Sequence, residues 1–210
     1  MTGSRVPASG VAVRPARADD IAAAGLVFDA AATAYTRLAG SADDGRRIVA
    51  RVWSQPGHSA SFEHALVAEI DGQAVGVLIG FPVRDRYRLH RALLLTSLRD
   101  LRPGRWPLLA AALPQIVLAS PRPPRGAYYI GTIAVARHAR WRGVAGTLAH
   151  HAEIAAEARG FRHMVAHTGT RHAIARRALE NHGFRLARAR RNGYALYVKG
   201  IGATIDAGAS

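Results

Sequence analysis

The sequence predicts an α/β fold in which helices flank a mixed, mostly antiparallel central sheet. Short apolar runs of strand length alternate with longer segments in which apolar residues recur at helical spacing. Two pairs of apolar runs are joined by Asp71-Gly72 and Asn192-Gly193, dipeptides typical of tight hairpins. Hairpins give antiparallel neighbours, whereas a helix between two strands permits a parallel pair. The predicted sheet is therefore mixed.

The elements predicted before the first hairpin are a strand over 11–14 and helices over 21–38 and 43–53. Pro15 ends the strand, because proline cannot donate a backbone hydrogen bond. Apolar residues recur at helical spacing through the first helix. Asp43 opens the second helix, since acidic side chains stabilise a first helical turn. This part of the chain thus contributes one strand and two helices.

The first hairpin joins strands over 64–70 and 73–81. Residues 83–126 after it form the least regular stretch of the sequence, and we interpret them as a helical insertion before the central strand. Arg102-Pro103-Gly104 divides this insertion, because proline and glycine interrupt helices. The two helices predicted within it are 84–101 and 106–118.

Strands and helices alternate in the remaining chain. Gly160 and Gly183 each follow a predicted helix in the position of a C-terminal cap. The second hairpin closes the fold around Asn192-Gly193. The predicted elements are strands over 128–135 and 162–168, helices over 143–159 and 172–182, and hairpin strands over 184–190 and 194–199.

Composition indicates one domain over 11–200, between flexible tails at 1–10 and 201–210. The chain has 210 residues, of which 49% are hydrophobic, enough for a sizeable core. No apolar run reaches the roughly 18–20 residues that span a bilayer, and no signal peptide is visible, so we expect a cytoplasmic protein without membrane contact. The absence of cysteine excludes disulfides, thiolate metal sites and a cysteine nucleophile.

A net charge of +15 attracts anions. Nucleic acid is one such partner, but the basic residues are scattered and arginine has almost wholly replaced lysine, so we do not expect it as the main partner. The ten histidines include no metal-ligand spacing. Only His150 and Glu153 share a helix face, which gives two ligands at best. We expect no metal.

The segment after the strand Ile133–Val135 has the features of a phosphate-binding loop. Arg140 and Arg142 precede a helix that opens on small residues, beginning at Gly143. A helix N-terminus offers unpaired backbone donors and a partial positive charge, which suit phosphate. The motifs of dinucleotide and mononucleotide loops are both absent. The segment is therefore built to bind some other phosphorylated ligand.

The order Arg140-x-x-Gly143-x-Ala145 resembles the acyl-CoA loop of the GNAT superfamily of N-acetyltransferases, whose pattern is Gln/Arg-x-x-Gly-x-Gly/Ala. The strand–helix–strand that follows ends in Gly183-Phe184, which is similar to the C-terminal half of that family. The resemblance covers roughly residues 11–199, apart from the insertion. It implies the GNAT fold.

The resemblance implies direct transfer of an acetyl group from acetyl-CoA, or from another acyl-CoA, to a primary amine of a small molecule or protein. Backbone groups of Ile133 and Val135 are expected to pair with the pantetheine arm, and N–H groups from Arg142 to Thr147 to hold the pyrophosphate. Homodimers are common in the family, and the sequence does not decide whether this chain forms one. The cofactor-binding residues implied are Ile133, Ala134, Val135, Arg140, Arg142, Gly143, Val144, Ala145, Gly146, Thr147 and His172.

Two residues are candidates for proton transfer, because the family's usual groups are missing. The position of the usual tyrosine falls on Leu179, and the central strand has no carboxylate. By period-two alternation Tyr129 shares a face with Ile133 and Val135. His167 lies at the end of its strand, where the GNAT sheet splays open, and histidine titrates near neutral pH. The alternatives are core packing for Tyr129 and a backbone hydrogen bond for His167.

The missing tyrosine leaves a second function open, that of a non-catalytic acyl-CoA-binding sensor or regulatory module. Acceptor choice is expected to lie in the insertion 83–126. A cationic cluster near its start either receives an acidic group of the acceptor or lies on a solvated helix face. Its members are Arg84, Arg86, Tyr87, Arg88, His90 and Arg91.

Overall fold

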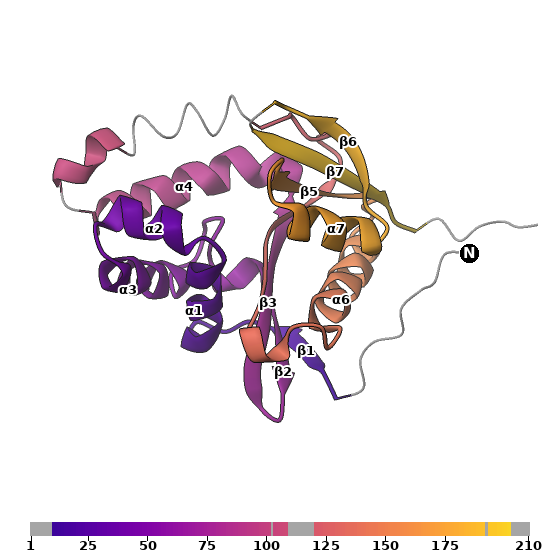
Figure 1. The fold of residues 1–210 in the computed structure, drawn as a ribbon, viewed down its shortest axis with the longest axis horizontal. Coiled ribbons are helices and arrows are strands. Elements are labelled where there is room, and N and C mark those ends of the chain that lie inside the picture. Colours follow the sequence, from indigo (N-terminus) through magenta and orange to yellow (C-terminus); the bar gives the residue numbers. More distant parts are fainter. Residues whose placement is uncertain (1–9, 102, 109–119, 192, 203–210) are drawn as a thin grey trace, which may run out of the picture.

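The computed structural model describes residues 10–101, 103–108, 120–191 and 193–202, and within them a seven-stranded sheet runs in the order β1-β2-β3-β4-β5-β7-β6 (Figure 1). Only β4 and β5 pair in parallel; every other neighbouring pair is antiparallel. The predicted sheet is confirmed. The strands are β1 Ala12–Pro15, β2 Ala65–Ile70, β3 Gln73–Pro82, β4 Tyr128–Val135, β5 His163–Gly169, β6 Arg185–Ala189 and β7 Tyr194–Gly200.

Helices cover both faces of the sheet (Figure 1). On one side lie α1 Ile21–Ala30, α2 Ala32–Ala39, α3 Ala42–Trp53 and α4 Arg86–Leu98, and on the other lie α6 Val144–Ala158 and α7 Ala173–Asn181. Short 3-10 turns connect several elements: η1 Phe62–His64, η2 Val83–Asp85, η3 Pro103–Arg105 and η4 Arg137–Ala139. The GNAT-like arrangement of helices around a mixed sheet is therefore present.

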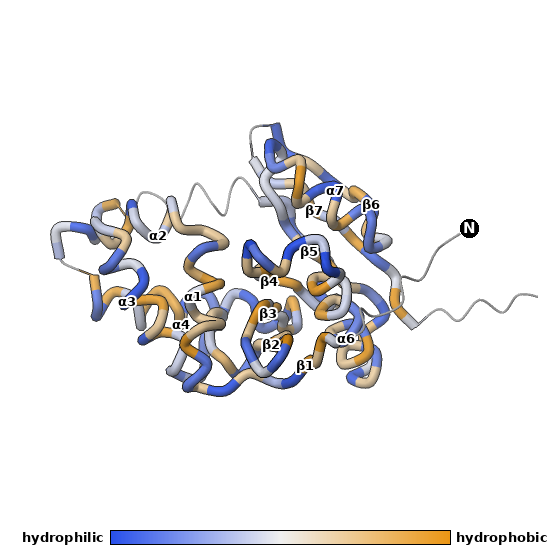
Figure 2. Tube along the Cα trace, turned by 60° about the horizontal axis from the view of Figure 1, so that its bottom comes forward, coloured by the Kyte–Doolittle hydropathy of each residue, from blue (hydrophilic) through white to orange (hydrophobic). Residues whose placement is uncertain are grey.

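Alternation along β3 divides the core into two layers. Val77 and Phe81 pack with the helices α1, α3 and α4, whereas Leu78 packs with Leu148 of α6 on the opposite face. Successive side chains of a strand point to opposite faces, so one buried strand supplies both layers. The hydrophobic segments, orange in Figure 2, run through the central strands and the helices beside them.

The first hairpin has the predicted turn. Asp71 and Gly72 both have positive φ, 51° and 74°, which the two-residue turn requires. Glycines also end the predicted helices, with φ of 80° at Gly160 and 82° at Gly183. These local predictions are confirmed because each depends on the conformational preferences of one or two residues.

The prediction of one continuous helix over 21–38 is wrong. Ala31 leaves the helical conformation, at φ −138° and ψ 34°, and separates α1 from α2. Alanine itself favours helix, so the break has no local cause. Both helices pack on α3, but only α1 also packs on β3 and β4 of the sheet. The chain therefore turns at Ala31 where its contact with the sheet ends.

The inserted segment is partly helical, as predicted. Helix α4 begins at Arg86, after the 3-10 turn of η2, and ends at Leu98. Most of the predicted helix 106–118 lies outside the described residues, as do most of the tails 1–10 and 201–210. Ile201 does not belong to a flexible tail: it is buried, and its N–H donates to the carbonyl of Arg162 at 3.0 Å.

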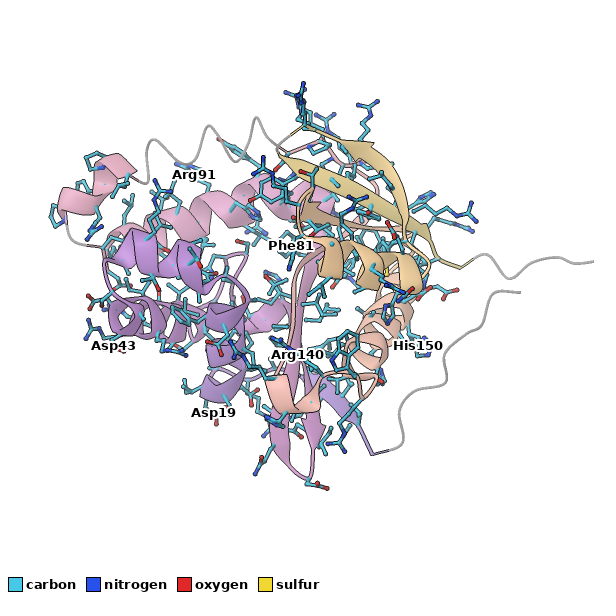
Figure 3. All side chains as sticks on the ribbon, viewed as in Figure 1. Asp19, Asp43, Phe81, Arg91, Arg140 and His150 are labelled. Atoms are coloured by element: carbon cyan, nitrogen blue, oxygen red, sulfur yellow. The ribbon has the colours of Figure 1, made fainter. Side chains whose placement is uncertain are left out.

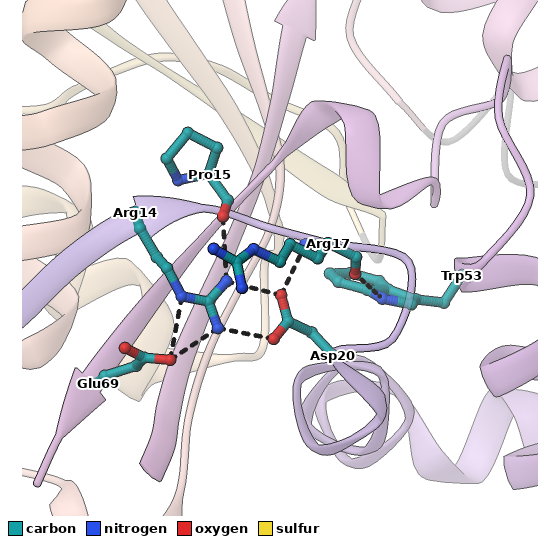
Figure 4. A network of polar contacts seen from close by, with 6 residues as sticks. All are labelled: Arg14, Pro15, Arg17, Asp20, Trp53 and Glu69. Atoms are coloured by element: carbon teal, nitrogen blue, oxygen red, sulfur yellow. Dashed lines mark hydrogen bonds and ion pairs between the residues drawn. The ribbon is translucent and has the colours of Figure 1, made fainter. Parts of the chain in front are cut away.

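An ion-pair network fastens β1 to β2 and to the start of α1 (Figure 4). The Arg14 guanidinium donates to Asp20 at 2.7 and 2.8 Å and to Glu69 at 2.7 and 3.0 Å. Asp20 also accepts the backbone N–H of Arg17 at 2.6 Å, and the indole of Trp53 donates to the Arg17 carbonyl at 3.1 Å. This network sets the entry of the chain into α1, which covers the cavity described below.

Candidate active site

A β-bulge at Gly131 distorts β4 in the middle of the sheet. Ile79 pairs with Thr132 and Gly80 with Ile130, so Gly131 between them has no partner on β3. The pairing of β4 with β5 ends at the same level, at Ile130 and Ala166. Bulges bend a strand and interrupt its ladder. Beyond this point β4 and β5 separate, and the sheet opens.

The bulge overturns the predicted alternation along β4. Tyr129 packs in the same layer as Ala134, whereas Ile130 packs in the opposite layer with Val135. An extra residue reverses the faces of every position that follows it. Tyr129 and Val135 therefore lie on opposite faces of the sheet, and the prediction that they share one is wrong.

Backbone groups of β4 are turned toward the opening. The N–H of Ala136 donates to the carbonyl of Val75 at 2.8 Å, and donors in an antiparallel strand alternate between its two edges. The N–H and C=O groups of Ile133 and Val135 therefore point away from β3, to the side where no described strand pairs with them. The Val135 carbonyl accepts a side-chain hydrogen bond from Arg140 Nε at 3.3 Å.

The segment from Arg140, which Figure 3 labels, to the start of α6 is a tight turn, named the anion-binding turn here for the geometry of its backbone. Trp141 and Gly143 both have positive φ, 66° and 78°, and Gly143 caps α6 in the left-handed conformation. Alternating left- and right-handed residues turn successive N–H groups toward one concave side. The N–H groups of the first helical turn point the same way, since they have no partner within the helix. This geometry suits a phosphate group.

Two residues of the expected pyrophosphate set already have neighbours. The N–H of Thr147 donates to the Gly143 carbonyl at 3.0 Å, so it is bonded within the helix. Gly146 lies against His182: a Cβ at Gly146 would stand 2.7 Å from His182 Nε2. The open donors at the start of α6 are therefore those of its first residues, including Val144 and Ala145. Arg142 is exposed beside them.

A cavity of about 300 Å³ lies between the separated strands and the helices around them. It has mostly apolar walls with a few histidine, threonine and tyrosine side chains. Among the expected site residues it contacts Ile133, Ala145, His167 and His172. Its walls are Val27, Ala30, Ala31, Tyr35, Ile130, Gly131, Thr132, Ile133, Ala145, Ala149, Ala166, His167, Thr168, His172, Ala175, Ala178, Leu179, His182 and Phe184.

His167 presents one ring nitrogen to a fixed partner and the other to none. Its Nε2 lies 2.7 Å from the carbonyl oxygen of Pro121, so Nε2 carries the proton and donates it. Its Nδ1 is buried and has no hydrogen-bond partner among the described residues. Burial lowers the pKa of His167, and the positive charge of Arg86 adds to this effect. The side chain is therefore neutral at pH 7, with a free lone pair.

Tyr129 lies behind His167, in the core layer and outside the cavity wall. The centroid of its ring is 5.7 Å from that of His167 and 5.5 Å from that of Phe81. Burial raises the pKa of its hydroxyl. A buried phenol that faces aromatic neighbours has the contacts of a packing residue, which was the alternative reading of this position.

Sequence reasoning missed four polar residues of the cavity, Tyr35, Thr132, Thr168 and His182. Tyr35 stacks on Phe28 with ring centroids 6.0 Å apart, and its place on the cavity depends on the turn at Ala31. His182 follows Leu179 by three residues, a spacing that puts both on one helix face. That spacing was a usable signal for His182, whereas no local pattern pointed to Tyr35.

His172 is the N-cap residue of α7, lies at the cavity wall and is exposed.

No group of three or more possible metal ligands occurs in the described parts of the chain. Within those same parts, no helix is long and apolar enough to cross a membrane. The polar groups of the site are therefore histidines, hydroxyls and backbone amides.

Comparisons with known proteins agree with this geometry. The model of the acetyltransferase (GNAT) family matches residues 32–184. Among solved structures, an N-acetyltransferase from Staphylococcus aureus Mu50 has a TM-score of 0.65 at 17% identity, covering 89% of this chain and 99% of that one. No curated protein matches the sequence.

Two further solved structures resemble this fold and contain coenzyme A or acetyl-CoA. A PaiA N-acetyltransferase from Thermoplasma acidophilum in complex with coenzyme A has a TM-score of 0.52 at 10% identity, covering 90% of this chain and 98% of that one. A GNAT family acetyltransferase from Elizabethkingia anophelis with acetyl-CoA bound has a TM-score of 0.54 at 13% identity, covering 92% and 99%. At such identities these likenesses concern the fold.

Proposed function

Because this chain belongs to the GNAT family of acetyltransferases, we propose that it transfers an acetyl group from acetyl-CoA directly to a primary amine of a small molecule or protein. The observation that carries the proposal is the pairing of two features at one end of the sheet. The unpaired edge of β4 at Ile133 and Val135 adjoins the anion-binding turn at Gly143. Both are needed to hold an extended chain that ends in phosphates.

The site fits the chemical parts of acetyl-CoA in order. The amides of a pantetheine arm can pair with the β4 backbone as an added strand would. The pyrophosphate can accept hydrogen bonds from the first N–H groups of α6, where the helix dipole also favours negative charge. Hydrogen bonds to charged groups contribute roughly 1.5–3 kcal/mol each. Arg140 and Arg142 add positive charge, and the thioester would then lie in the cavity near His167.

His167 supplies the base that acyl transfer to an amine requires. An alkylammonium with a pKa near 10 must lose a proton before its nitrogen can attack. The ammonium proton passes to Nδ1 of His167, and the freed amine nitrogen forms a bond to the thioester carbonyl carbon. The carbon–sulfur bond breaks, and the second proton of the nitrogen leaves to solvent. The free lone pair of Nδ1 and the place of His167 among the residues of the cavity wall support this role.

The leaving thiolate needs no dedicated acid in this scheme. Leu179, at the position of the family's usual tyrosine, cannot donate a proton. Thiols ionise near pH 8.5, so the thiolate is a tolerable leaving group near neutral pH and can take its proton from water. A leucine at position 179 is therefore compatible with acetyl transfer.

Calorimetric titration with acetyl-CoA, followed by free-thiol release with a panel of amines, tests the proposal. Micromolar binding together with amine-dependent thiol release would support it. Binding without turnover on any amine would favour the second candidate, a non-catalytic acyl-CoA sensor, for which Leu179 is the specific observation. No binding would overturn both functions.

A further inference from the structure

Arg86 differs from the other arginines near the start of the inserted segment, because its side chain turns inward. It is the first residue of α4, directly after η2. Its guanidinium carbon lies 5.3 Å from the centroid of the Tyr129 ring, in a cation–π contact. Its Nε atom is buried and has no hydrogen-bond partner among the described residues. Arg86 is thus a half-buried cation with an unused donor.

The neighbouring arginines have the ordinary surroundings of surface residues. Arg84 and Arg88 lie 4.0 and 3.8 Å from Asp85, with side chains that are 74% and 68% exposed. Arg91 is exposed farther along α4 (Figure 3). The reading of this cluster as a solvated helix face therefore applies to these three, while Arg86 stands apart from them.

No described carboxylate forms an ion pair with Arg86. Charged groups removed from water are normally paired, because an unpaired buried charge loses its hydration without compensation. A planar guanidinium is also the side chain that best matches a carboxylate, through two parallel hydrogen bonds. Within the described residues Arg86 therefore has no anionic partner, and a carboxylate bound from outside would supply one.

Arg86 and the proposed base flank the same ring. Tyr129 lies 5.3 Å from the Arg86 guanidinium carbon and 5.7 Å from the His167 ring, both measured to its centroid. The cavity wall beside His167 contains no acidic side chain among its described residues. A purely cationic amine would find no counter-charge on that wall. Arg86 lies behind the wall, against Tyr129, where its positive charge attracts the anionic group of an amine that carries one.

We propose that the acceptor is an amino acid or a similar small amine bearing a carboxylate, and that Arg86 binds this carboxylate while the amine faces His167. This inference rests on the proposed acetyltransferase activity. His167 takes the ammonium proton, the acceptor nitrogen forms the amide bond to the acetyl carbon, the carbon–sulfur bond breaks, and the second proton of the nitrogen leaves to solvent. The carboxylate is unchanged, and the product is an N-acetylated amino acid.

The test compares acceptors that differ only in charge, namely a set of amino acids and their own carboxamides. We expect thiol release to favour the acids. At about pH 8, where His167 is neutral with or without the Arg86 charge, Arg86→Gln should lower kcat/KM for the acids by roughly 10- to 100-fold while leaving the carboxamides unaffected. Arg86→Lys should restore part of the preference, since it keeps the charge but not the planar fork. Arg88→Gln removes the same charge two residues farther along α4 and should change neither rate.

A second readout does not depend on turnover. N-acetyl amino acids should bind to the protein in the presence of CoA more tightly than their carboxamides, and Arg86→Gln should remove the difference. Equal rates for acids and carboxamides, or a preference that survives Arg86→Gln, would overturn the carboxylate site and leave the acetyltransferase proposal intact. If the rate of thiol release were the same with and without an amine, both the carboxylate site and the acetyltransferase proposal would be overturned.

Discussion

The Nε2 atom of His167 lies 2.7 Å from the carbonyl oxygen of Pro121. This contact joins the end of β5 to the last part of the inserted segment, 46 positions away in sequence. Because a carbonyl accepts only, the contact fixes the tautomer of His167 and leaves Nδ1 as its basic atom. The inserted segment therefore helps to orient the proposed base as well as to carry Arg86.

We expect His167→Ala to lower kcat by about 10²–10⁴-fold, the usual contribution of a general base. The affinity for acetyl-CoA should stay within about twofold, since the proposed base contacts the acceptor. Binding is measured by calorimetry and rate by thiol release. Unchanged kcat at saturating acceptor would remove His167 from the mechanism.

The pH dependence of kcat should identify the same residue. Burial and Arg86 lower the pKa of His167 below its usual value of 6.5, so its neutral, basic form is kept down to that lower pKa. The acid limb of the wild-type profile should therefore lie below pH 6.5 and be absent in His167→Ala. An acid limb that survives the substitution would assign the ionisation to another group.

Gly143→Glu should abolish acetyl-CoA binding, because a carboxylate would occupy the position proposed for the pyrophosphate. Gly143 has φ of 78°, so the substitution also strains the backbone. Gly160→Glu is the matched control: it lies at the other end of α6 with φ of 80° and open space around it. Both variants should lose about 1–2 kcal/mol of unfolding free energy.

Calorimetry with acetyl-CoA and urea denaturation separate the two effects of these substitutions. The Gly160→Glu variant should bind acetyl-CoA with the affinity of the unchanged protein. Equal loss of affinity in both variants would attribute the effect to backbone strain in α6. Retained affinity in Gly143→Glu would contradict the assignment of the anion-binding turn.

Arg14→Met should destabilise the fold by about 1–3 kcal/mol, because it leaves the carboxylates of Asp20 and Glu69 without their shared cation. The side chain of Asp20 is only 11% exposed in its pair with Arg14. The exposed pair of Arg47 and Asp44 provides the control, and Arg47→Met should change stability by less than about 0.5 kcal/mol. Urea denaturation at pH 7 measures both.

Acid should expose the same difference. Hydrogen bonds from Arg14 lower the pKa of Asp20, so the stability it contributes is present above the carboxylate's unfolded pKa and is lost as pH falls through the folded pKa. The Arg14→Met variant should therefore lose less unfolding free energy than the unchanged protein between about pH 5 and pH 2, the range in which carboxylates titrate. Parallel pH curves for both proteins would contradict this linkage.

A second acid-sensitive group is His58, which is 1% exposed. Burial lowers its pKa, so the unfolded chain takes up a proton that the folded chain does not, and stability should fall as pH drops from 6.5 toward the folded pKa. His58→Asn should flatten this slope, because an amide does not titrate in this range. The amide oxygen can still accept the N–H of Ala60 that His58 Nδ1 accepts at 3.2 Å, so the hydrogen bond is kept. Denaturation midpoints between about pH 4 and 7 provide the measurement.

The sequence alone determined the order of the strands, the two hairpins and the helix ends at Gly160 and Gly183. Each depends on a few adjacent residues: a periodicity, a turn dipeptide or a glycine at positive φ. Such features are local, and local preferences were enough to predict them.

Only the tertiary structure decided which side chains surround the site. The turn at Ala31 that brings Tyr35 to the cavity follows from packing, since alanine has no tendency to end a helix. The bulge at Gly131 reversed the faces of β4, and one unpaired residue is enough to do so. The group formed by Arg86, Tyr129 and His167 joins three distant segments. Contacts of this kind depend on how the whole sheet and its helices pack, which no local pattern records.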